Sequence, residues 1–400
     1  MKIGMMADVY QTHVSGVTNS ITLSKEWLEK AGHDVYIFTF GHGESGDDER
    51  HIIRTEGVPL VDTGIYLNLR YSRQARHLLY TMDITHVHHP FVSGSLAMRY
   101  CAPRNIPIVF TNHSRYDLMA QAYVPILPES IGEAALKAYL SPFYRACDLV
   151  IVPSPSMRQV LQELYGLTAP VEVIPNGLDL RPYQSNPQPV DRAQFSFSKD
   201  DVIFTYLGRI APEKNLSFLL HAFYGVAMTY SHVRLLFVGD GPDRENLETQ
   251  VKLMNISSKV YFSGMVEYKY VPNYLAASDI FVTPSGSETF GLSTVEAMAS
   301  GLPVIGVEAP GTRDIIEDGV NGFLCPDDLA VFTAKMVLMA TDHDLRHRLG
   351  QQALESSKKY DIQTTTAILQ QHYERLVEAA RRRRVSVRQR MVRLLDRFQR

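Results

Sequence analysis

The stretch "DIFVTPSGSETFGLSTVEAMASGLPVI", residues 279–305, decides the fold of this chain. An apolar run leads into a polar loop, the loop turns at a glycine, and a helix-like segment follows before the next apolar run. Apolar runs joined by helices are typical of parallel strands that are buried on both faces. The stretch therefore predicts a strand–helix–strand unit that carries two carboxylates, Glu288 and Glu296, around its first loop.

The same alternation continues over most of the chain. Six strand-like runs lie before a stretch rich in Pro, Ser and Gln at 182–198, and five more lie after it. A length of 400 residues also favours two domains over one. We therefore expect two doubly wound α/β domains, an N-terminal one over residues 1–185 and a C-terminal one over 200–360, with the boundary near residue 185.

Composition excludes several classes of protein. No run approaches 18 uninterrupted apolar residues, so no transmembrane helix is expected. The N-terminus reads as a strand and lacks the long apolar core of a signal peptide. The three cysteines, at 101, 147 and 325, are odd in number and far apart, which favours a reducing cytoplasm over a disulfide or zinc framework.

The end of the chain differs in charge from the rest. Residues 381–400 contain nine arginines and one aspartate, a net +8, so a total of −3 leaves −11 on the other 380 residues. On a helix the tail's apolar residues would form one stripe: Val387, Met391, Leu394, Leu395 and Phe398. This pattern predicts an interfacial helix on an anionic membrane surface, with a disordered soluble tail as the alternative.

In doubly wound sheets, ligands bind beyond the carboxyl ends of the strands. Arg209 and Lys214 follow the first strand of the second half, with no aspartate pair nearby to neutralise them, which suits a diphosphate. The helix that starts at Gly291 points N–H groups outward, as an anion requires. Glu288 and Glu296 then either cap this helix or accept hydrogen bonds from hydroxyl-rich groups. A diphosphate flanked by two polyols describes a nucleotide sugar.

The N-terminal half offers weaker signals. Gly16 stands where a helix should begin, so it either lets backbone N–H groups approach an anion or belongs to an ordinary helix cap. His113 lies just past a buried strand and is either structural or part of a site. The histidines of "THVHHP" (85–90) have no cysteine or acidic ligand nearby in the sequence, so no metal site is expected there.

These motifs resemble the retaining glycosyltransferases of the GT-B fold, specifically family 4. The two-glutamate motif encloses "FGL". Six further segments match the family pattern in order: "IPNGLD" (174–179), "LGRIAPEKN" (207–215), "VGDGP" (238–242), "YLAASDIFVTPS" (274–285), "EAMASGLPVI" (296–305) and "DGVNGFL" (318–324). The resemblance covers residues 1–375. It departs at "PGTRDII" (310–316), where Thr312 replaces a glycine and Asp314 a glutamate.

The resemblance implies a role for each matched residue. On the C-terminal side, Arg209 and Lys214 would neutralise the donor diphosphate, Glu288 would bind the transferred sugar and Glu296 the ribose. Of the remaining donor contacts, Gly16, Phe290, Gly291 and Leu292 would bind the diphosphate, and "FSGMVEY" (262–268), which contains Met265 and Val266, would line the base pocket. His113 would approach the sugar. The family's two domains face each other across a cleft, and its last helices cross back onto the N-terminal domain. The helix expected over 361–379 should do the same, with Ile368, Leu369, Tyr373, Leu376 and Val377 at helical spacing.

No cofactor is required by the sequence. The cations and the helix end can stabilise the leaving diphosphate, so neither Mg²⁺ nor another metal is needed. The donor expected from the resemblance is UDP-glucose, with GDP-mannose as the alternative.

The acceptor is the most open question. The aromatic and apolar segment 115–143 and the start "ADVYQTHVSGV" resemble parts of bacterial diacylglycerol glucosyltransferases, although simple helix packing also explains 115–143. Segment 67–80 mixes arginines with leucines, as a membrane-facing or a solvated helix would. We therefore expect transfer of a hexose to a membrane lipid by a protein peripheral to the inner face of the cell membrane. The alternatives are a soluble synthase or epimerase of the same fold, and a nucleic-acid-binding protein, which is disfavoured because no recognition motif accompanies the arginines.

Overall fold

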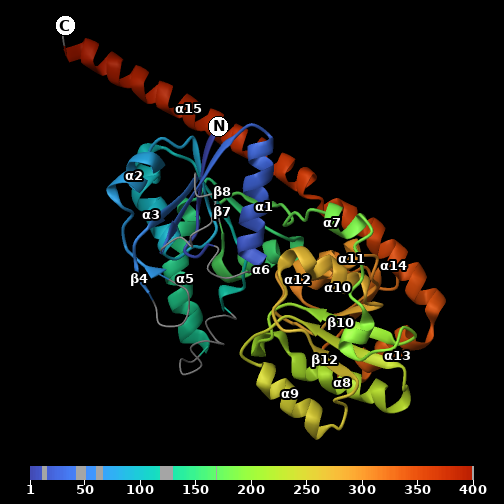
Figure 1. Ribbon diagram of the computed structural model, residues 1–400. Coiled ribbons are helices and arrows are strands. Elements are labelled where there is room, and N and C mark those ends of the chain that lie inside the picture. The colour runs from blue at the N-terminus through green and yellow to red at the C-terminus, as the bar shows by residue number, and fades with distance from the viewer. Residues whose placement is uncertain (11–15, 42–50, 60–65, 118–128, 168, 399–400) are drawn as a thin grey trace. The chain divides into compact units, whose positions relative to one another are not determined.

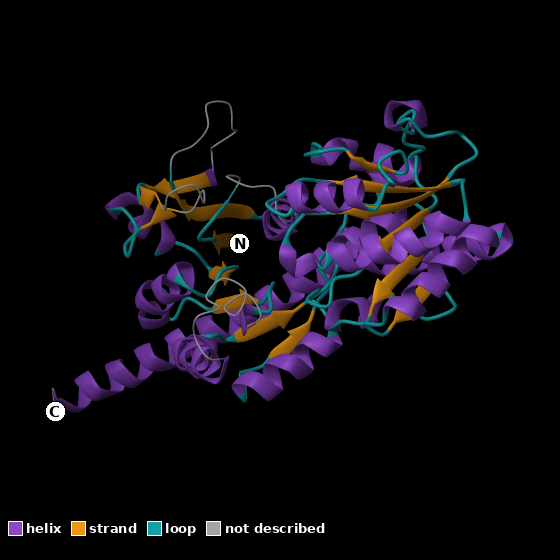
Figure 2. Ribbon diagram, turned by 90° about the horizontal axis from the view of Figure 1, so that it is seen from below, coloured by secondary structure: helices purple, strands orange, loops and turns teal. Residues whose placement is uncertain are grey.

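The computed structural model describes residues 1–10, 16–41, 51–59, 66–117, 129–167 and 169–398 (Figure 1). Contacts divide the chain into two compact units, Met1–Gly177 together with Ile362–Arg400, and Leu178–Asp361. Each unit contains one parallel sheet with helices packed against it (Figure 2). The predicted fold class, two doubly wound α/β domains, is confirmed.

The first unit is built on a seven-stranded sheet in the order β3-β2-β1-β6-β7-β8-β9. All six strand pairs are parallel, and the central strands are buried along their whole length because helices cover both faces. A short antiparallel pair, β4 and β5, lies outside this sheet. The strands are β1 (Lys2–Met6), β2 (Asp34–Phe40), β3 (Ile52–Thr55), β4 (Val58–Pro59), β5 (Tyr66–Leu67), β6 (Ile84–Val87), β7 (Ile108–Thr111), β8 (Leu149–Val152) and β9 (Val171–Val173).

The helices of the first unit connect these strands. Two of them begin with a serine whose hydroxyl accepts from the first turn: Ser72 accepts from Ala75 N and Ser154 from Met157 N. The helices are α1 (Gly16–Lys30), α2 (Arg73–Leu79), α3 (Val92–Tyr100), α5 (Glu129–Ala146), α6 (Pro155–Tyr165) and α15 (Ile362–Phe398), with a 3₁₀ turn at Ala102–Arg104.

The second unit is built on a six-stranded parallel sheet in the order β12-β11-β10-β13-β14-β15. The strands are β10 (Val202–Leu207), β11 (Val233–Val238), β12 (Val260–Phe262), β13 (Ile280–Thr283), β14 (Val304–Val307) and β15 (Gly322–Cys325). The helices are α7 (Arg181–Gln184), α8 (Leu216–Thr229), α9 (Arg244–Leu253), α10 (Val271–Ala276), α11 (Leu292–Ala299), α12 (Pro310–Ile315), α13 (Leu329–Thr341) and α14 (His343–Ser357). Further 3₁₀ turns lie at Arg192–Phe195, Pro212–Lys214, Tyr268–Tyr270 and Lys358–Tyr360.

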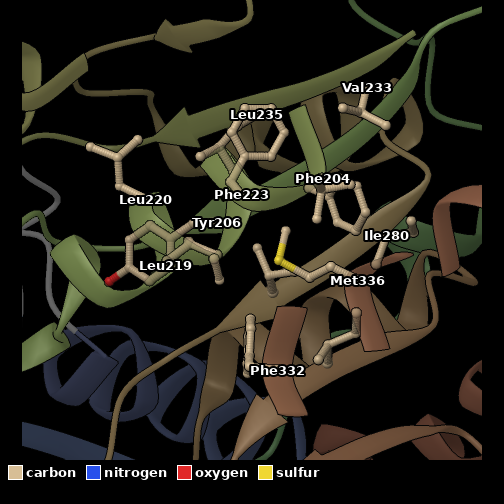
Figure 3. Close-up of a cluster of buried hydrophobic side chains, with 14 of the residues drawn as sticks. Phe204, Tyr206, Leu219, Leu220, Phe223, Val233, Leu235, Ile280, Phe332 and Met336 are labelled. Carbon is tan, nitrogen blue, oxygen red and sulfur yellow. The ribbon is translucent and has the colours of Figure 1, made fainter. Parts of the chain in front are cut away.

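One face of the second sheet packs against α8 and α13 (Figure 3). Phe204 of β10 meets Phe223 of α8 with their ring centroids 6.3 Å apart, while Met336 of α13 joins the same cluster. These side chains are completely buried. Burial of this kind stabilises the strands whose carboxyl ends carry the site, because each large apolar side chain contributes about 1.5–3 kcal/mol.

Helix α15 returns to the first unit. Leu369, Tyr373 and Val377 are buried in the cluster that also holds Ile21 and Leu28 of α1. The Tyr373 hydroxyl lies 2.5 Å from His86 Nδ1. The prediction that the helix over 361–379 packs on the N-terminal domain is therefore confirmed.

The arginine-rich end continues the same helix. The backbone is helical up to Phe398, as the interfacial-helix hypothesis for 381–400 requires. At its start, Arg381 pairs with Asp83 at 3.1 Å and Arg383 pairs with Asp148 at 3.4 Å. The side chains from residue 384 onward, which carry the predicted apolar stripe, lie outside the described part of the chain.

Candidate active site

The order of strands in the second unit fixes where its loops meet. From β10 the chain proceeds to β11 and β12 on one side of the sheet and then to β13 on the other side of β10. The loops that follow β10 and β13 therefore diverge, and the crevice between such loops is where doubly wound sheets bind ligands. Phe204 and Ile280 lie side by side in the two strands. Lys214 and Glu288 follow these strands, and Lys214 Nζ lies 2.6 Å from Glu288 Oε1.

Both cations of the β10 loop have acidic partners. Lys214 pairs with Glu288, and Arg209 pairs with Glu213 four residues along the chain. No aspartate pair neutralises these cations, as expected from the sequence, but two glutamates do, and one of them comes from another loop. The Arg209 side chain is 53% exposed, and pairs this open to solvent contribute little stability. An anionic ligand could therefore displace Glu213 from Arg209.

Helix α12 contacts the loop 288–292 through its backbone. The N–H of Gly311 donates to the Glu288 carbonyl oxygen at 2.8 Å. A Cβ on Gly311 would lie 2.5 Å from the Phe290 nitrogen, so this approach requires glycine. Thr312, at the departure from the family pattern, is buried; its hydroxyl donates to the Val307 carbonyl oxygen and accepts from Ala309 N. This threonine therefore fixes the start of α12 and with it the approach of Gly311.

Gly291 adopts a left-handed conformation, with φ of +78°, directly before α11. This turn gives α11 a start at Leu292 without a side-chain cap, so its first backbone N–H groups have no side-chain acceptor at the N-cap. Phe290 is buried edge-on against Tyr360, with ring centroids 5.4 Å apart. The described geometry thus presents backbone N–H groups beside the Lys214–Glu288 pair.

Glu296 lies inside α11 and is buried. Its Oε1 accepts a hydrogen bond from the Tyr183 hydroxyl at 3.1 Å, and the hydroxyl oxygens of Tyr183 and Tyr268 lie 3.3 Å apart. Burial raises the pKa of Glu296 to about 7, although hydrogen bonds from Tyr268 and Tyr183 act in the opposite direction. The carboxyl group therefore titrates near neutral pH.

Sequence reasoning did not single out these two tyrosines. Tyr183 belongs to α7 within the proline-rich stretch, and Tyr268 follows the loop that was expected to line a base pocket. Within that loop Met265 is 71% exposed and Val266 packs against the second unit's core. The only signal for Tyr268 was its place at the end of "FSGMVEY" (262–268).

The next candidate residue, Gly16, belongs to the first unit. The strand order changes between β1 and β6, and Gly16 opens α1, the helix that follows β1. Among described atoms, none lies within 4 Å of a Cβ added at Gly16, so a close approach remains open. The residues 11–15 before it lie outside the described part.

His113 is buried and its Nε2 lies 3.0 Å from His88 Nδ1. Burial lowers the pKa of His113 to about 3, with the neighbouring His89 and His86 acting in the same direction. His86 bonds to Tyr373 and to Thr111, and His89 accepts from the backbone of Asp8. Burial also lowers the pKa of His86 to about 3. These rings are therefore neutral at physiological pH and form hydrogen-bonded groups.

The segment expected to face the acceptor is described in part. Residues 118–128 lie outside the described part, while α5 covers 129–143 of this segment. Tyr139 of α5 is half exposed and donates to the Phe91 carbonyl oxygen at 3.2 Å. Phe91 is also partly exposed, so aromatic surface is present next to α5.

The described residues contain neither a candidate metal centre nor a helix suited to span a membrane. No group of three or more His, Cys, Asp or Glu residues in the described ranges could hold a metal ion. Of the helices that the structure describes, none combines the length and apolar character needed to cross a bilayer.

Comparisons with known proteins match both halves of the chain. Residues 187–356 match the family model of glycosyl transferases group 1, and residues 14–181 match that of glycosyltransferase family 4. The alpha-monoglucosyldiacylglycerol synthase of Streptococcus pneumoniae is 31% identical over 89% of this chain and 82% of its own length. A GDP-mannose-dependent alpha-mannosyltransferase of Corynebacterium glutamicum is 27% identical over 96% of this chain and 91% of its own length. Sucrose-phosphate synthase of Thermosynechococcus elongatus superposes with a TM-score of 0.77 at 23% identity, covering 94% of this chain and 99% of that structure.

Proposed function

The chain belongs to family 4 of the glycosyltransferases, retaining enzymes that use nucleotide sugars, and on this premise we propose that it transfers glucose from UDP-glucose to a membrane lipid such as diacylglycerol. The observation that carries the proposal is the Lys214–Glu288 pair at the switch point of the second sheet. The chain's similarity to a glucosyldiacylglycerol synthase over most of both lengths supports the choice of sugar and acceptor.

In the proposed complex, the donor diphosphate takes over the cations of the β10 loop. Lys214 and Arg209 turn from their glutamates toward the phosphates, and the N–H groups at the start of α11, around Phe290, Gly291 and Leu292, face the distal phosphate. Glu288, released from Lys214, accepts hydrogen bonds from the sugar hydroxyls. Glu296 accepts from the ribose, and the loop with Met265 and Val266 faces the base. In the first unit, we assign Gly16 to donor binding and His113 to catalysis.

These groups act on the bond between the anomeric carbon and the diphosphate oxygen. As that bond breaks, negative charge develops on the diphosphate while the sugar gains oxocarbenium character. Fixed cations and N–H groups aimed at the diphosphate stabilise this transition state more than the ground state. The acceptor hydroxyl then bonds to the anomeric carbon and loses its proton, which leaves with the nucleoside diphosphate. We propose that His113 contacts the sugar as a neutral imidazole, consistent with the lowered pKa.

The proposed acceptor side includes a membrane surface. The helical backbone of 381–398 supports an interfacial helix, and the sequence supplies its arginines. Arg381 and Arg383 are paired with aspartates of the first unit, so the arginines from 384 onward are the ones assigned to lipid phosphates. We place the protein on the cytoplasmic face of the cell membrane.

A second donor is favoured by one specific observation. The similarity to a GDP-mannose-dependent mannosyltransferase covers nearly the whole chain. Hydrolysis and transfer assays with purified protein should therefore compare UDP-glucose with GDP-mannose, each with and without diacylglycerol vesicles. The proposal expects UDP release from UDP-glucose and little GDP release from GDP-mannose. The opposite preference would replace the glucosyltransferase proposal by a mannosyltransferase one, and a lack of stimulation by vesicles would favour a soluble acceptor.

A further inference from the structure

A small polar cavity lies inside the first unit, where β6 and β7 meet α1, α15 and the segment 174–177. Its volume is about 30 Å³, and a cavity needs about 10–15 Å³ to hold one water molecule. His86 and His88 contribute to its wall from the sheet side, and Thr365 and Thr366 contribute from α15. The cavity therefore has room for water next to the histidine that contacts His113.

Two side-chain atoms in this wall lack a protein partner. His88 Nε2 and Thr366 Oγ1 are both buried, and within the ranges that the structure describes no protein group hydrogen-bonds to either. Other polar groups of the wall are satisfied: Ser20 donates to Asn176, Thr365 to the Ile362 carbonyl oxygen, and both ring nitrogens of His86 are bonded. Leaving one buried polar atom without a hydrogen bond destabilises the folded state by about 1–3 kcal/mol. A single partner that bonds to both atoms would remove this cost.

We propose that a water molecule bound in this cavity hydrogen-bonds to both His88 Nε2 and Thr366 Oγ1, and that His88, held in this way, is a positioning residue for His113. His88 Nδ1 faces His113 Nε2 at 3.0 Å, so the orientation of the first ring sets that of the second. The His86 ring lies 4.1 Å from the His88 ring and is itself fixed by Tyr373 and Thr111. The role assigned to His113 rests on the proposed function.

The chemistry of neutral imidazole supports this assignment. Burial lowers the pKa of His88, with His86, His113 and His89 acting in the same direction, so the ring is neutral. A neutral imidazole has one donor and one acceptor nitrogen. In either tautomer, Nδ1 of His88 is paired with His113. Its Nε2 needs an acceptor when it carries the proton and a donor when it does not, so the partner must be able to act in either way. Water meets this requirement, and a water held at Nε2 by Thr366 Oγ1 keeps the His88 ring in one orientation toward His113.

The first test removes the water's other partner. Thr366→Val keeps the shape of the side chain and removes the hydroxyl, while Thr364→Val makes the same change at an exposed position of α15. We expect Thr366→Val to lower kcat for transfer about three- to tenfold, the size of one lost buried hydrogen bond, with KM for the donor unchanged. Thr364→Val should match the wild type. Equal kcat values in the two variants would overturn the proposal.

The second test acts on His88 itself. His88→Leu removes both ring nitrogens, whereas His88→Asn keeps a polar group near the position of Nδ1. Partial rescue of kcat by the Asn variant relative to the Leu variant is expected, and no difference between them would contradict a positioning role.

Two readouts are independent of activity. A crystal structure of the wild-type protein should show ordered density within hydrogen-bonding distance of both His88 Nε2 and Thr366 Oγ1, and a dry cavity would overturn the proposal. Nitrogen-15 NMR of the histidine rings should show a hydrogen-bonded His88 Nε2 in the wild type and a changed Nε2 chemical shift in Thr366→Val. If His113→Ala retained the full transfer rate, the catalytic assignment of His113 would fail, while the density and the spectra would still decide the water site.

Discussion

The Lys214 ammonium lies 2.6 Å from the Glu288 carboxylate, although the two residues are 74 positions apart in the sequence. Their side chains meet because β10 and β13 are neighbours in the sheet while the chain between them forms β11 and β12 elsewhere. The pair is about one-fifth exposed at each partner, so it can be opened by a ligand without exposing a charge in the core. In the proposed mechanism the donor opens it, and each partner binds a different part of the same molecule.

Replacing either partner of this pair should abolish transfer while leaving the fold intact. Glu288→Gln removes the charge that binds the sugar, and Lys214→Ala removes a cation that stabilises the leaving diphosphate. We expect each variant to lose more than tenfold in transfer rate, a loss of more than about 1.4 kcal/mol of transition-state stabilisation. Steady-state kinetics measure the rate, and circular dichroism checks the fold. Lys358→Ala, which removes an exposed pair with Glu355, is the control and should retain full activity. Either site variant with more than a tenth of the wild-type rate would contradict its assigned role.

Donor binding should strengthen as pH rises through neutrality. The pKa of Glu296 is raised to about 7, so at pH 6 only about a tenth of the carboxyl groups are ionised and able to accept strongly from a ribose. Calorimetric titration with UDP-glucose should therefore give a Kd several-fold lower at pH 8 than at pH 6. Glu296→Gln should remove most of this dependence. A wild-type Kd that is the same at both values would show that Glu296 does not ionise in this range or does not bind the donor.

The same carboxyl group should make stability depend on pH. Its pKa is higher in the folded protein than the usual value of 4.5, so the folded state binds more protons than the unfolded state between about pH 4.5 and 7. The free energy of unfolding gained from the protonated group is present at low pH and is lost as pH rises through 7. Denaturant unfolding at pH 6 and pH 8 should show that the free energy of unfolding falls less between these pH values in Glu296→Gln than in the wild type. A larger loss in the variant would contradict the raised pKa.

Gly311→Ala should damage both the donor loop and stability. The new Cβ would lie 2.5 Å from the Phe290 nitrogen, and because that atom is backbone the loop 288–292 must shift. Overpacking of this kind typically costs about 1–3 kcal/mol. Thermal unfolding and transfer kinetics should both show the defect. Gly286→Ala is the matched control, since among described atoms a Cβ there meets none within 4 Å. Equal behaviour of the two variants would argue against a close approach at Gly311.

Removal of residues 384–400 should release the protein from anionic vesicles. The segment carries six arginines and one aspartate, and each basic residue near an anionic surface contributes about 1 kcal/mol before screening. A truncation after Arg383 keeps the pairs with Asp83 and Asp148, so the packed part of α15 is retained. Liposome sedimentation should show full-length protein in the pellet at low salt and truncated protein in the supernatant. Equal pelleting would reject the tail and direct attention to residues 67–80.

The strands were predictable because their sequences are continuous apolar runs. Every strand run identified from the sequence corresponds to a strand of the structure, whereas β3, β4, β5 and β15 were not among those runs. These four strands have only two to four residues each, and "IIRT" and "GFLC" lie next to charged or glycine-rich segments. Glu288 and Lys214 could be named from spacing, but their direct contact depends on strand order, which spacing does not show. Tyr183 and His88 gave no signal because their roles come from packing against distant residues.

The most direct test of the account is the product formed from labelled UDP-glucose. Purified full-length protein should be incubated with UDP-glucose and anionic vesicles that contain diacylglycerol, and the lipids should be extracted and analysed by mass spectrometry. The account predicts an α-linked glucosyl lipid that forms with wild-type protein and is lost in Lys214→Ala and Glu288→Gln. Formation of the lipid at an undiminished rate in either variant, or transfer only from GDP-mannose, would contradict it.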